Sequence, residues 1–188
     1  MNKSPALLST ANSLLIIVDL QTKLSAVMPA TEAKLITANA GSLVEAAVIL
    51  NIPVLVTEQY PKGLGTTDTT IIQKLPEATP IFKKTGFSCC LAENFCNVLE
   101  SSERKQIILT GLEAHVCVLQ TALELLHNGY QVYVVEDAIC SRKSVHKIYA
   151  LQRMQQQGIT IINHESVLFE WLRDASHPDF RSISGLLQ

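Results

Sequence analysis

The chain lacks three features by which several classes of protein are recognised. No apolar run in its 188 residues approaches the roughly 20 residues of a membrane helix. Its 15 lysines and arginines form no basic stripe and stand against 17 acidic residues. The apolar stretch near Lys3 has neither the length nor the cleavage site of a signal peptide. We therefore expect neither a membrane nor a nucleic acid as a partner.

Several cofactor and nucleophile motifs are also missing. The five cysteines form no CxxC pair and no Cys/His cluster with zinc spacing. The segment Gly63-Leu64-Gly65 lacks the third glycine of a dinucleotide loop, and there is no Walker A motif or Gly-x-Ser-x-Gly elbow. An odd number of cysteines without an export signal favours free thiols in a reducing, cytoplasmic setting.

What the chain does have is a regular alternation of apolar strands and amphipathic helices. Residues 14–20 form a near-continuous apolar run, which is typical of a strand buried on both faces. Further strands are predicted at residues 53–58, 80–84, 106–110, 130–136 and 159–162. Helices are predicted at residues 31–50, 69–75, 91–100, 116–127, 144–157 and 164–173, with a loop at residues 59–70. This order predicts one α/β domain over residues 1–188, a three-layer α/β/α, doubly wound and mostly parallel sheet.

In such sheets ligands bind beyond the carboxyl ends of the strands, so residues at these ends are candidates for chemistry. Asp19 ends the first strand inside an apolar run, where a carboxylate is costly unless it is paired. Lys84 ends the third predicted strand. Cys117 lies about one turn into the helix that follows Gly111, and a helix start should lower the pKa of its thiol.

Each of these residues has an ordinary alternative: a loop-capping aspartate, a surface lysine and a buried structural cysteine. Together they favour nucleophilic catalysis, because a thiol needs a base and a lysine would stabilise the charge of that base. If the first and fourth strands are neighbours, Asp19 and Cys117 end side by side. His115 lies two residues before Cys117, a spacing at which helical side chains do not face each other. We expect His115 to have a structural or pocket-lining role.

The order and spacing of these segments resemble those of the isochorismatase-like cysteine hydrolases. The resemblance rests on residues 15–21 (LIIVDLQ), 56–66 (VTEQYPKGLGT), 84–88 (KTGFS), 110–120 (TGLEAHVCVLQ) and 135–138 (VEDA). The loop at residues 58–61 resembles that of the small isochorismatase-domain proteins. The likeness implies a catalytic triad. Asp19 would act as general base and then acid, Lys84 would hold and polarise the site, and Cys117 would attack an electrophilic carbon.

The resemblance also implies a cis peptide at Leu112–Glu113, which would aim the backbone N–H groups of Glu113 and Cys117 at an oxyanion. The loop after the second strand carries no histidine, unlike the metal site of nicotinamidases, so we expect no metal or other cofactor. Isochorismatases that cleave a vinyl ether lack the nucleophilic cysteine. The presence of Cys117 therefore favours covalent hydrolysis of an amide-type C–N bond in a small molecule.

Three further expectations complete this interpretation. Tyr60 and Phe87 follow strand ends and are candidate pocket walls, with core packing as the alternative. The family likeness implies a homo-oligomer, a dimer or larger. A non-catalytic binding or scaffold protein of the same fold is the rival to the hydrolase, and a redox role for Cys89 and Cys90 is a third hypothesis.

Overall fold

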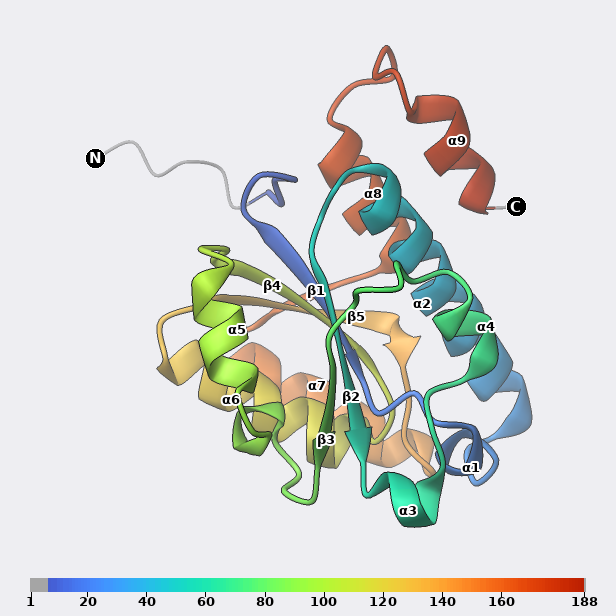
Figure 1. Cartoon of the computed structure of the whole chain (residues 1–188), viewed down its shortest axis with the longest axis vertical. Helices are drawn as coiled ribbons and strands as arrows, with labels where there is room; N and C mark the ends of the chain where they lie inside the picture. The colour runs from blue at the N-terminus through green and yellow to red at the C-terminus, as the bar shows by residue number, and fades with distance from the viewer. Residues whose placement is uncertain (1–6, 188) are drawn as a thin grey trace.

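A six-stranded parallel sheet forms the centre of the computed structural model, which describes residues 7–187 (Figure 1). The strands, in sequence order, are β1 (Ser13–Val18), β2 (Val54–Gln59), β3 (Ile81–Lys84), β4 (Gln106–Gly111), β5 (Gln131–Ile139) and β6 (Thr160–Ile162). They lie in the order β3-β2-β1-β4-β5-β6, and every neighbouring pair is parallel. Lys3 lies outside the described residues.

Helices cover both faces of this sheet (Figure 1). One face carries α2 (Ala30–Ile49) and α8 (His164–Leu172), and the other carries α5 (Phe95–Ser101), α6 (Leu119–His127) and α7 (Ser144–Gln156). The shorter helices are α1 (Thr22–Ser25), α3 (Pro61–Leu64), α4 (Thr69–Ile72) and α9 (Phe180–Ser184). The predicted doubly wound α/β/α fold is confirmed. Within residues 7–187, the structure contains no helix with the length and apolar character needed to cross a membrane.

The central strands are apolar because both of their faces are covered. In β1, Leu15 and Ile17 pack into the core beneath α2 and α8, whereas Leu14 and Ile16 pack into the core beneath α5, α6 and α7. All four side chains are fully buried. A strand with two buried faces cannot alternate apolar and polar residues, which explains the continuous apolar run.

Two predicted helices begin differently in the structure. The helix expected at residues 91–100 starts only at Phe95, after a 3-10 turn over Cys89–Leu91 and a left-handed Asn94 with φ 60°. The helix expected at residues 116–127 is preceded by a π-helical turn over Ala114–Val118, which continues directly into α6. The predicted loop at residues 59–70 contains the short helix α3. Each difference lies in a segment that follows the carboxyl end of a strand.

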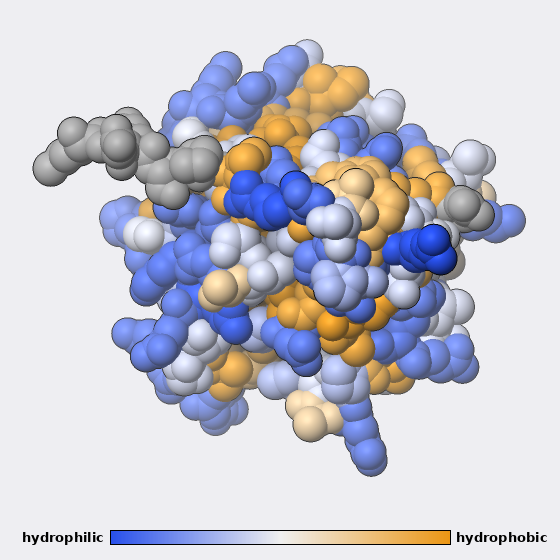
Figure 2. Space-filling model, turned by 90° about the horizontal axis from the view of Figure 1, so that it is seen from above, coloured by the Kyte–Doolittle hydropathy of each residue, from blue (hydrophilic) through white to orange (hydrophobic). Residues whose placement is uncertain are grey.

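The opposite end of the molecule, where the strands begin, has apolar residues interspersed with polar ones (Figure 2). A hollow of about 510 Å³ at this end is lined by residues that include Pro53, Val54, Pro80 and Val98. None of the candidate catalytic residues lines this hollow. The candidate chemistry is therefore confined to the carboxyl ends of the strands.

The strand order reverses between β1 and β4, and these two parallel strands approach closely at their carboxyl ends. Val18 is the register partner of Gly111, and the Leu112 N–H donates a hydrogen bond to the Val18 carbonyl at 3.0 Å. Gly111 has a φ of +129°, and a Cβ at this position would overlap the Val18 carbonyl oxygen. Only glycine allows the end of β4 to lie against β1 in this way.

The exchange Gly111→Ala is expected to destabilise the fold strongly. A strained φ alone costs about 1–3 kcal/mol, and the clash of the new Cβ with the backbone adds to that cost. Gly129→Ala is the matched control, since Gly129 has a φ of +84° and open space around it. Urea unfolding of both variants measures the difference. Equal losses of stability would show that the contact between β1 and β4 is not tight.

Candidate active site

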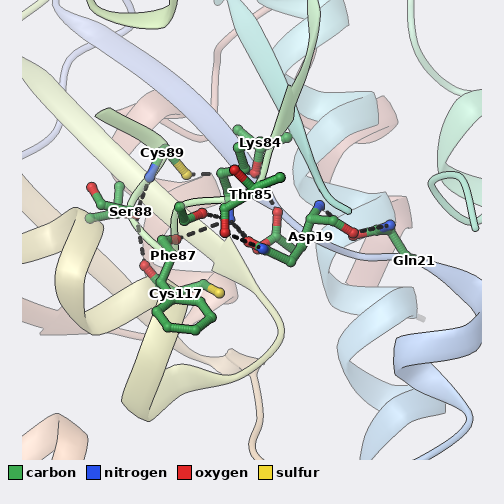
Figure 3. Close-up of polar contacts among 12 residues, drawn as sticks. Asp19, Gln21, Lys84, Thr85, Phe87, Ser88, Cys89 and Cys117 are labelled. Atoms are coloured by element: carbon green, nitrogen blue, oxygen red, sulfur yellow. Dashed lines mark hydrogen bonds and ion pairs between the residues drawn. The ribbon is translucent and has the colours of Figure 1, made fainter. Parts of the chain in front are cut away.

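Asp19 and Lys84 form a buried ion pair at the carboxyl end of the sheet (Figure 3). The Lys84 Nζ lies 2.6 Å from the Asp19 Oδ2, and both side chains are fully shielded from solvent. Asp19 directly follows β1 with a left-handed φ of 51°, and Lys84 is the last residue of β3. The lysine reaches across the end of β2, which lies between these strands. Pairing explains how Asp19 is accommodated among apolar residues, and a surface position for Lys84 is ruled out.

Other polar groups satisfy the remaining hydrogen-bonding capacity of this pair. The Lys84 Nζ also donates to the Gln59 Oε1 at 2.7 Å and to the Phe87 carbonyl at 2.9 Å. The Thr57 hydroxyl donates to the Asp19 Oδ1 at 2.8 Å. Both carboxylate oxygens of Asp19 therefore have a fixed donor, which holds the carboxylate in one orientation.

Gln21 in turn fixes the end of β2. Its Oε1 accepts from the Gln59 N–H at 2.7 Å, and its Nε2 donates to the Gln59 carbonyl at 3.0 Å. Glu58, which is 3% exposed, points away from this group and accepts from the Thr67 N–H and hydroxyl. Sequence reasoning missed Thr57, Gln59 and Gln21. Their position could have identified them, because all three are polar residues at strand ends next to an expected buried ion pair.

Cys117 lies in the π-helical turn after β4 and is only 4% exposed. Burial raises the pKa of its thiol above the usual range, and the nearby Asp19 carboxylate raises this pKa further. The Lys84 ammonium lowers this pKa, but by less. The sequence-based prediction of a thiol pKa lowered by a helix start is therefore wrong. The raised pKa favours the protonated thiol at neutral pH, with the Asp19 carboxylate nearby.

The turn that presents Cys117 contains no cis peptide, since none occurs within residues 7–187. The prediction of a cis bond at Leu112–Glu113 is therefore wrong. The chain reverses instead through the positive φ of Gly111, +129°, and the left-handed Glu113, φ 55°. The Ala114 N–H then donates to the Cys140 carbonyl at 2.8 Å, which ties the turn to the end of β5.

His115 faces a separate polar cluster at this turn. Its Nδ1 lies 3.0 Å from the Ser141 hydroxyl and 3.3 Å from the Glu113 Oε2, and its ring packs on that of His146. Arg142 donates to the other Glu113 oxygen at 2.6 Å. Burial lowers the pKa of His115, with the Glu113 carboxylate opposing that effect. These contacts support the expected structural role of His115.

Cys89 and Cys90 point to different surroundings. The Cys89 Sγ lies 3.5 Å from the Thr57 hydroxyl, and burial raises the pKa of this thiol to about 11. The Cys89 N–H donates to the Thr121 hydroxyl at 2.9 Å, and that hydroxyl donates to the Cys117 carbonyl at 2.7 Å. Thr121 thus links the turn of Cys89 to the turn of Cys117. Cys89 and Cys90 are both free thiols, with no bond between them.

The two candidate pocket walls are exposed, which excludes the alternative of core packing. Tyr60 is 54% exposed and Phe87 is 52% exposed. The Tyr60 N–H donates to the Lys84 carbonyl at 2.8 Å, and the Phe87 carbonyl accepts from the Lys84 Nζ. Both aromatic residues are therefore attached to the strand that carries the buried lysine. The structure brings Asp19, Lys84 and Cys117 together with these two residues at one end of the sheet.

The fold, with polar residues gathered at the switch point of a doubly wound sheet, is that of an isochorismatase-like α/β hydrolase. The sequence model described as Isochorismatase domain matches residues 13–166. The chain belongs to the isochorismatase family.

Relatives from several organisms share this domain. Isochorismatase domain-containing protein 2 of Danio rerio is 37% identical over 180 residues, which are 96% of this chain and 89% of that protein. Isochorismatase family protein 1B of Dictyostelium discoideum is 42% identical over 71% of this chain, and the match spans 66% of that protein, slightly under two thirds of its length. The secreted isochorismatase effector Isc1 of Phytophthora sojae is 42% identical over 78% of this chain and 71% of that protein.

Solved structures agree with the fold. The MAR1 ribonuclease of Caenorhabditis elegans is 39% identical with a TM-score of 0.91, covering 97% of this chain and 92% of that one. YcaC of Pseudomonas aeruginosa, solved with hexane-2,5-diol and covalent acrylamide, is 25% identical with a TM-score of 0.89, covering 98% and 93%. The YcaC product of Escherichia coli, an octameric hydrolase of unknown specificity, is 23% identical with a TM-score of 0.84, covering 98% and 97%.

The exchange Lys84→Met is expected to destabilise the protein by about 3–5 kcal/mol, because it leaves the Asp19 carboxylate buried without its counter-charge. Lys83→Met is the matched control, since Lys83 is the preceding residue of β3 and is exposed. The free energy of unfolding of both variants is measured by urea denaturation at pH 7. If Lys84→Met costs no more than Lys83→Met, the pair does not stabilise the fold.

Proposed function

We propose that this chain is a metal-independent cysteine hydrolase that cleaves an amide-type C–N bond of a small molecule. The observation that carries the proposal is that the Cys117 thiol and the Lys84 ammonium share one buried carboxylate, that of Asp19. A thiol that is protonated at rest needs a base within hydrogen-bonding reach, and Asp19 supplies one. The position of this group at the β1–β4 switch point is where such sheets bind ligands.

In the proposed reaction, Asp19 takes the proton of Cys117 as the Sγ attacks the carbonyl carbon. The negative charge that forms on the carbonyl oxygen accepts hydrogen bonds from the backbone N–H groups of Glu113 and Cys117. Asp19 then returns the proton to the departing nitrogen, and the C–N bond breaks to leave a thioester on Cys117. Water attacks the thioester while Asp19 accepts its proton, and the acid product and the free thiol are released.

Lys84 holds Asp19 in place and offsets its charge during these steps. Its hydrogen bonds to the Gln59 Oε1 and the Phe87 carbonyl fix the ammonium group independently of Asp19. Thr57 and Gln59 are positioning residues in this scheme, because they orient the carboxylate and the ammonium without reaching a reacting atom. No step requires a metal or another cofactor.

Tyr60 and Phe87 are the proposed substrate contacts, because both are exposed and are attached to Lys84 through their backbones. Exposed aromatic side chains beside a buried polar group suit a small, partly apolar amide. RNA is a less suitable substrate, although one structural relative is named a ribonuclease, because this chain has a net charge of −2 and its lysine at the site is neutralised by Asp19.

We also propose that the domain spans residues 1–188, acts in the cytoplasm and assembles as a homo-oligomer. Leu35 on α2 and Ile148 on α7 line one hollow and are 55% and 52% exposed, and Tyr149 on α7 is 66% exposed. Apolar side chains exposed together around one hollow are typical of a surface that is covered in an assembly. Light scattering of the purified protein measures the assembly, and a monomer at micromolar concentration would contradict it.

The exchange Cys117→Ala is expected to abolish turnover, because it removes the nucleophile, and to change the free energy of unfolding by only about 1 kcal/mol. Hydrolysis is measured across small amides, ureides and N-carbamoyl compounds, with RNA included as a substrate expected to be inert. Cys96→Ala is the matched control, since Cys96 is an exposed thiol away from Asp19.

Two outcomes would contradict the hydrolase proposal. Full activity of Cys117→Ala on any substrate of the wild type would remove the nucleophile from the mechanism. A wild type that turns over none of these compounds, and whose Cys117 reacts with acrylamide no faster than Cys96 does, would favour the binding or scaffold alternative.

A further inference from the structure

Cys96 packs against Cys90 outside the candidate active site. Cys90 lies in the 3-10 turn Cys89–Leu91, and Cys96 lies in the first turn of α5. The Cys96 Sγ lies 3.7 Å from the Cys90 carbonyl oxygen, which places the two residues side by side. The left-handed Asn94 between them folds the chain back, so that residues six positions apart meet.

The two thiols differ in how far solvent can reach them. Cys96 is exposed, so an oxidant in solution can attack its sulfur. Cys90 is half-buried, and burial together with the neighbouring Cys96 raises the pKa of its thiol to about 12. Cys90 therefore keeps its proton and stays beside Cys96 as a second thiol. An accessible cysteine next to a second, resolving cysteine is the usual arrangement of an oxidisable pair.

This pair is joined to the segment that surrounds Lys84. The Cys90 N–H donates to the Ser88 hydroxyl at 3.2 Å, and that hydroxyl donates to the Glu124 carboxylate on α6 at 2.6 Å. The Leu91 side chain packs over Gly86 so closely that a Cβ on Gly86 would overlap it. Lys84 donates to the carbonyls of both Gly86 and Phe87. A restraint on Cys90 thus acts on the backbone that holds the lysine.

We propose that Cys90 and Cys96 form a reversible disulfide that ties the 3-10 turn to α5 and restrains the segment holding Lys84. Hydrogen peroxide oxidises the Cys96 thiol to a sulfenic acid and is reduced to one water molecule. The Cys90 Sγ then attacks the Cys96 sulfur, the S–S bond forms, and the sulfenic oxygen leaves as a second water. In total two thiols lose two hydrogen atoms and one peroxide becomes two waters. A dithiol reductant reverses the change.

The test treats the reduced full-length protein with hydrogen peroxide, blocks the remaining thiols with N-ethylmaleimide and digests it with a glutamate-specific protease. Cleavage after Glu93 separates Cys90 from Cys96, so the disulfide joins two peptides that dithiothreitol releases. The cross-linked pair is expected in the wild type and in Cys89→Ser, and is expected to be absent from Cys90→Ser and Cys96→Ser. Cys140→Ser, which removes a buried thiol elsewhere, is expected to retain it.

A second measurement follows the restraint itself. Hydrogen exchange over residues 86–96 is expected to slow on oxidation of the wild type and to remain unchanged in Cys96→Ser. The proposal is overturned if Cys90 and Cys96 are both alkylated after peroxide, if Cys89→Ser abolishes the cross-link, or if Cys96 advances to sulfinic acid without one. It is also overturned if hydrogen exchange does not slow. These results are independent of amide turnover, so either proposal can fail while the other stands.

Discussion

The ion pair between Asp19 and Lys84 is the interaction on which the rest of the site depends. Both side chains are fully buried, and removing two charges from water costs several kcal/mol for each ion unless other polar groups replace the solvent. The protein supplies these groups from neighbouring segments: the hydroxyl of Thr57, the side-chain amide of Gln59 and the carbonyl of Phe87. The loops around the site are therefore held in place largely by the need to satisfy one charged pair.

The backbone is also constrained at the switch point of the sheet, where β4 ends against β1. Gly111 lets β4 end against Val18, and the left-handed residues Asp19 and Glu113 turn their strands out of the sheet on either side of this contact. The turn that carries Cys117 consequently lies over the end of β1, with its thiol near the Asp19 carboxylate. Strained backbone positions of this kind persist where the surrounding structure fixes them, and here they coincide with the candidate chemistry.

Much of the fold could be predicted from sequence because strands that are buried on both faces appear as continuous apolar runs. The apolar run that ends at Asp19 identified both the first strand and a carboxylate that is costly to bury. The pairing of β1 with β4 meets the condition under which Asp19 and Cys117 were expected to end side by side. The starts of the helices after β3 and β4 could not be predicted, because Asn94 and Glu113 adopt left-handed conformations that the tertiary structure imposes. The predicted direction of the Cys117 pKa shift was wrong for a related reason. Burial and Asp19 outweigh the helix start, and neither is visible in local sequence.

The central claim is that Asp19 is the base for the Cys117 thiol, and the variant Asp19→Asn tests it most directly. Acrylamide alkylation of Cys117 is followed by mass spectrometry as a function of pH, alongside amide turnover. Loss of the negative charge removes one cause of the raised thiol pKa and leaves the Lys84 ammonium to favour thiolate. The account predicts that the midpoint of alkylation moves to lower pH while turnover is lost. An unchanged midpoint with turnover retained would contradict it.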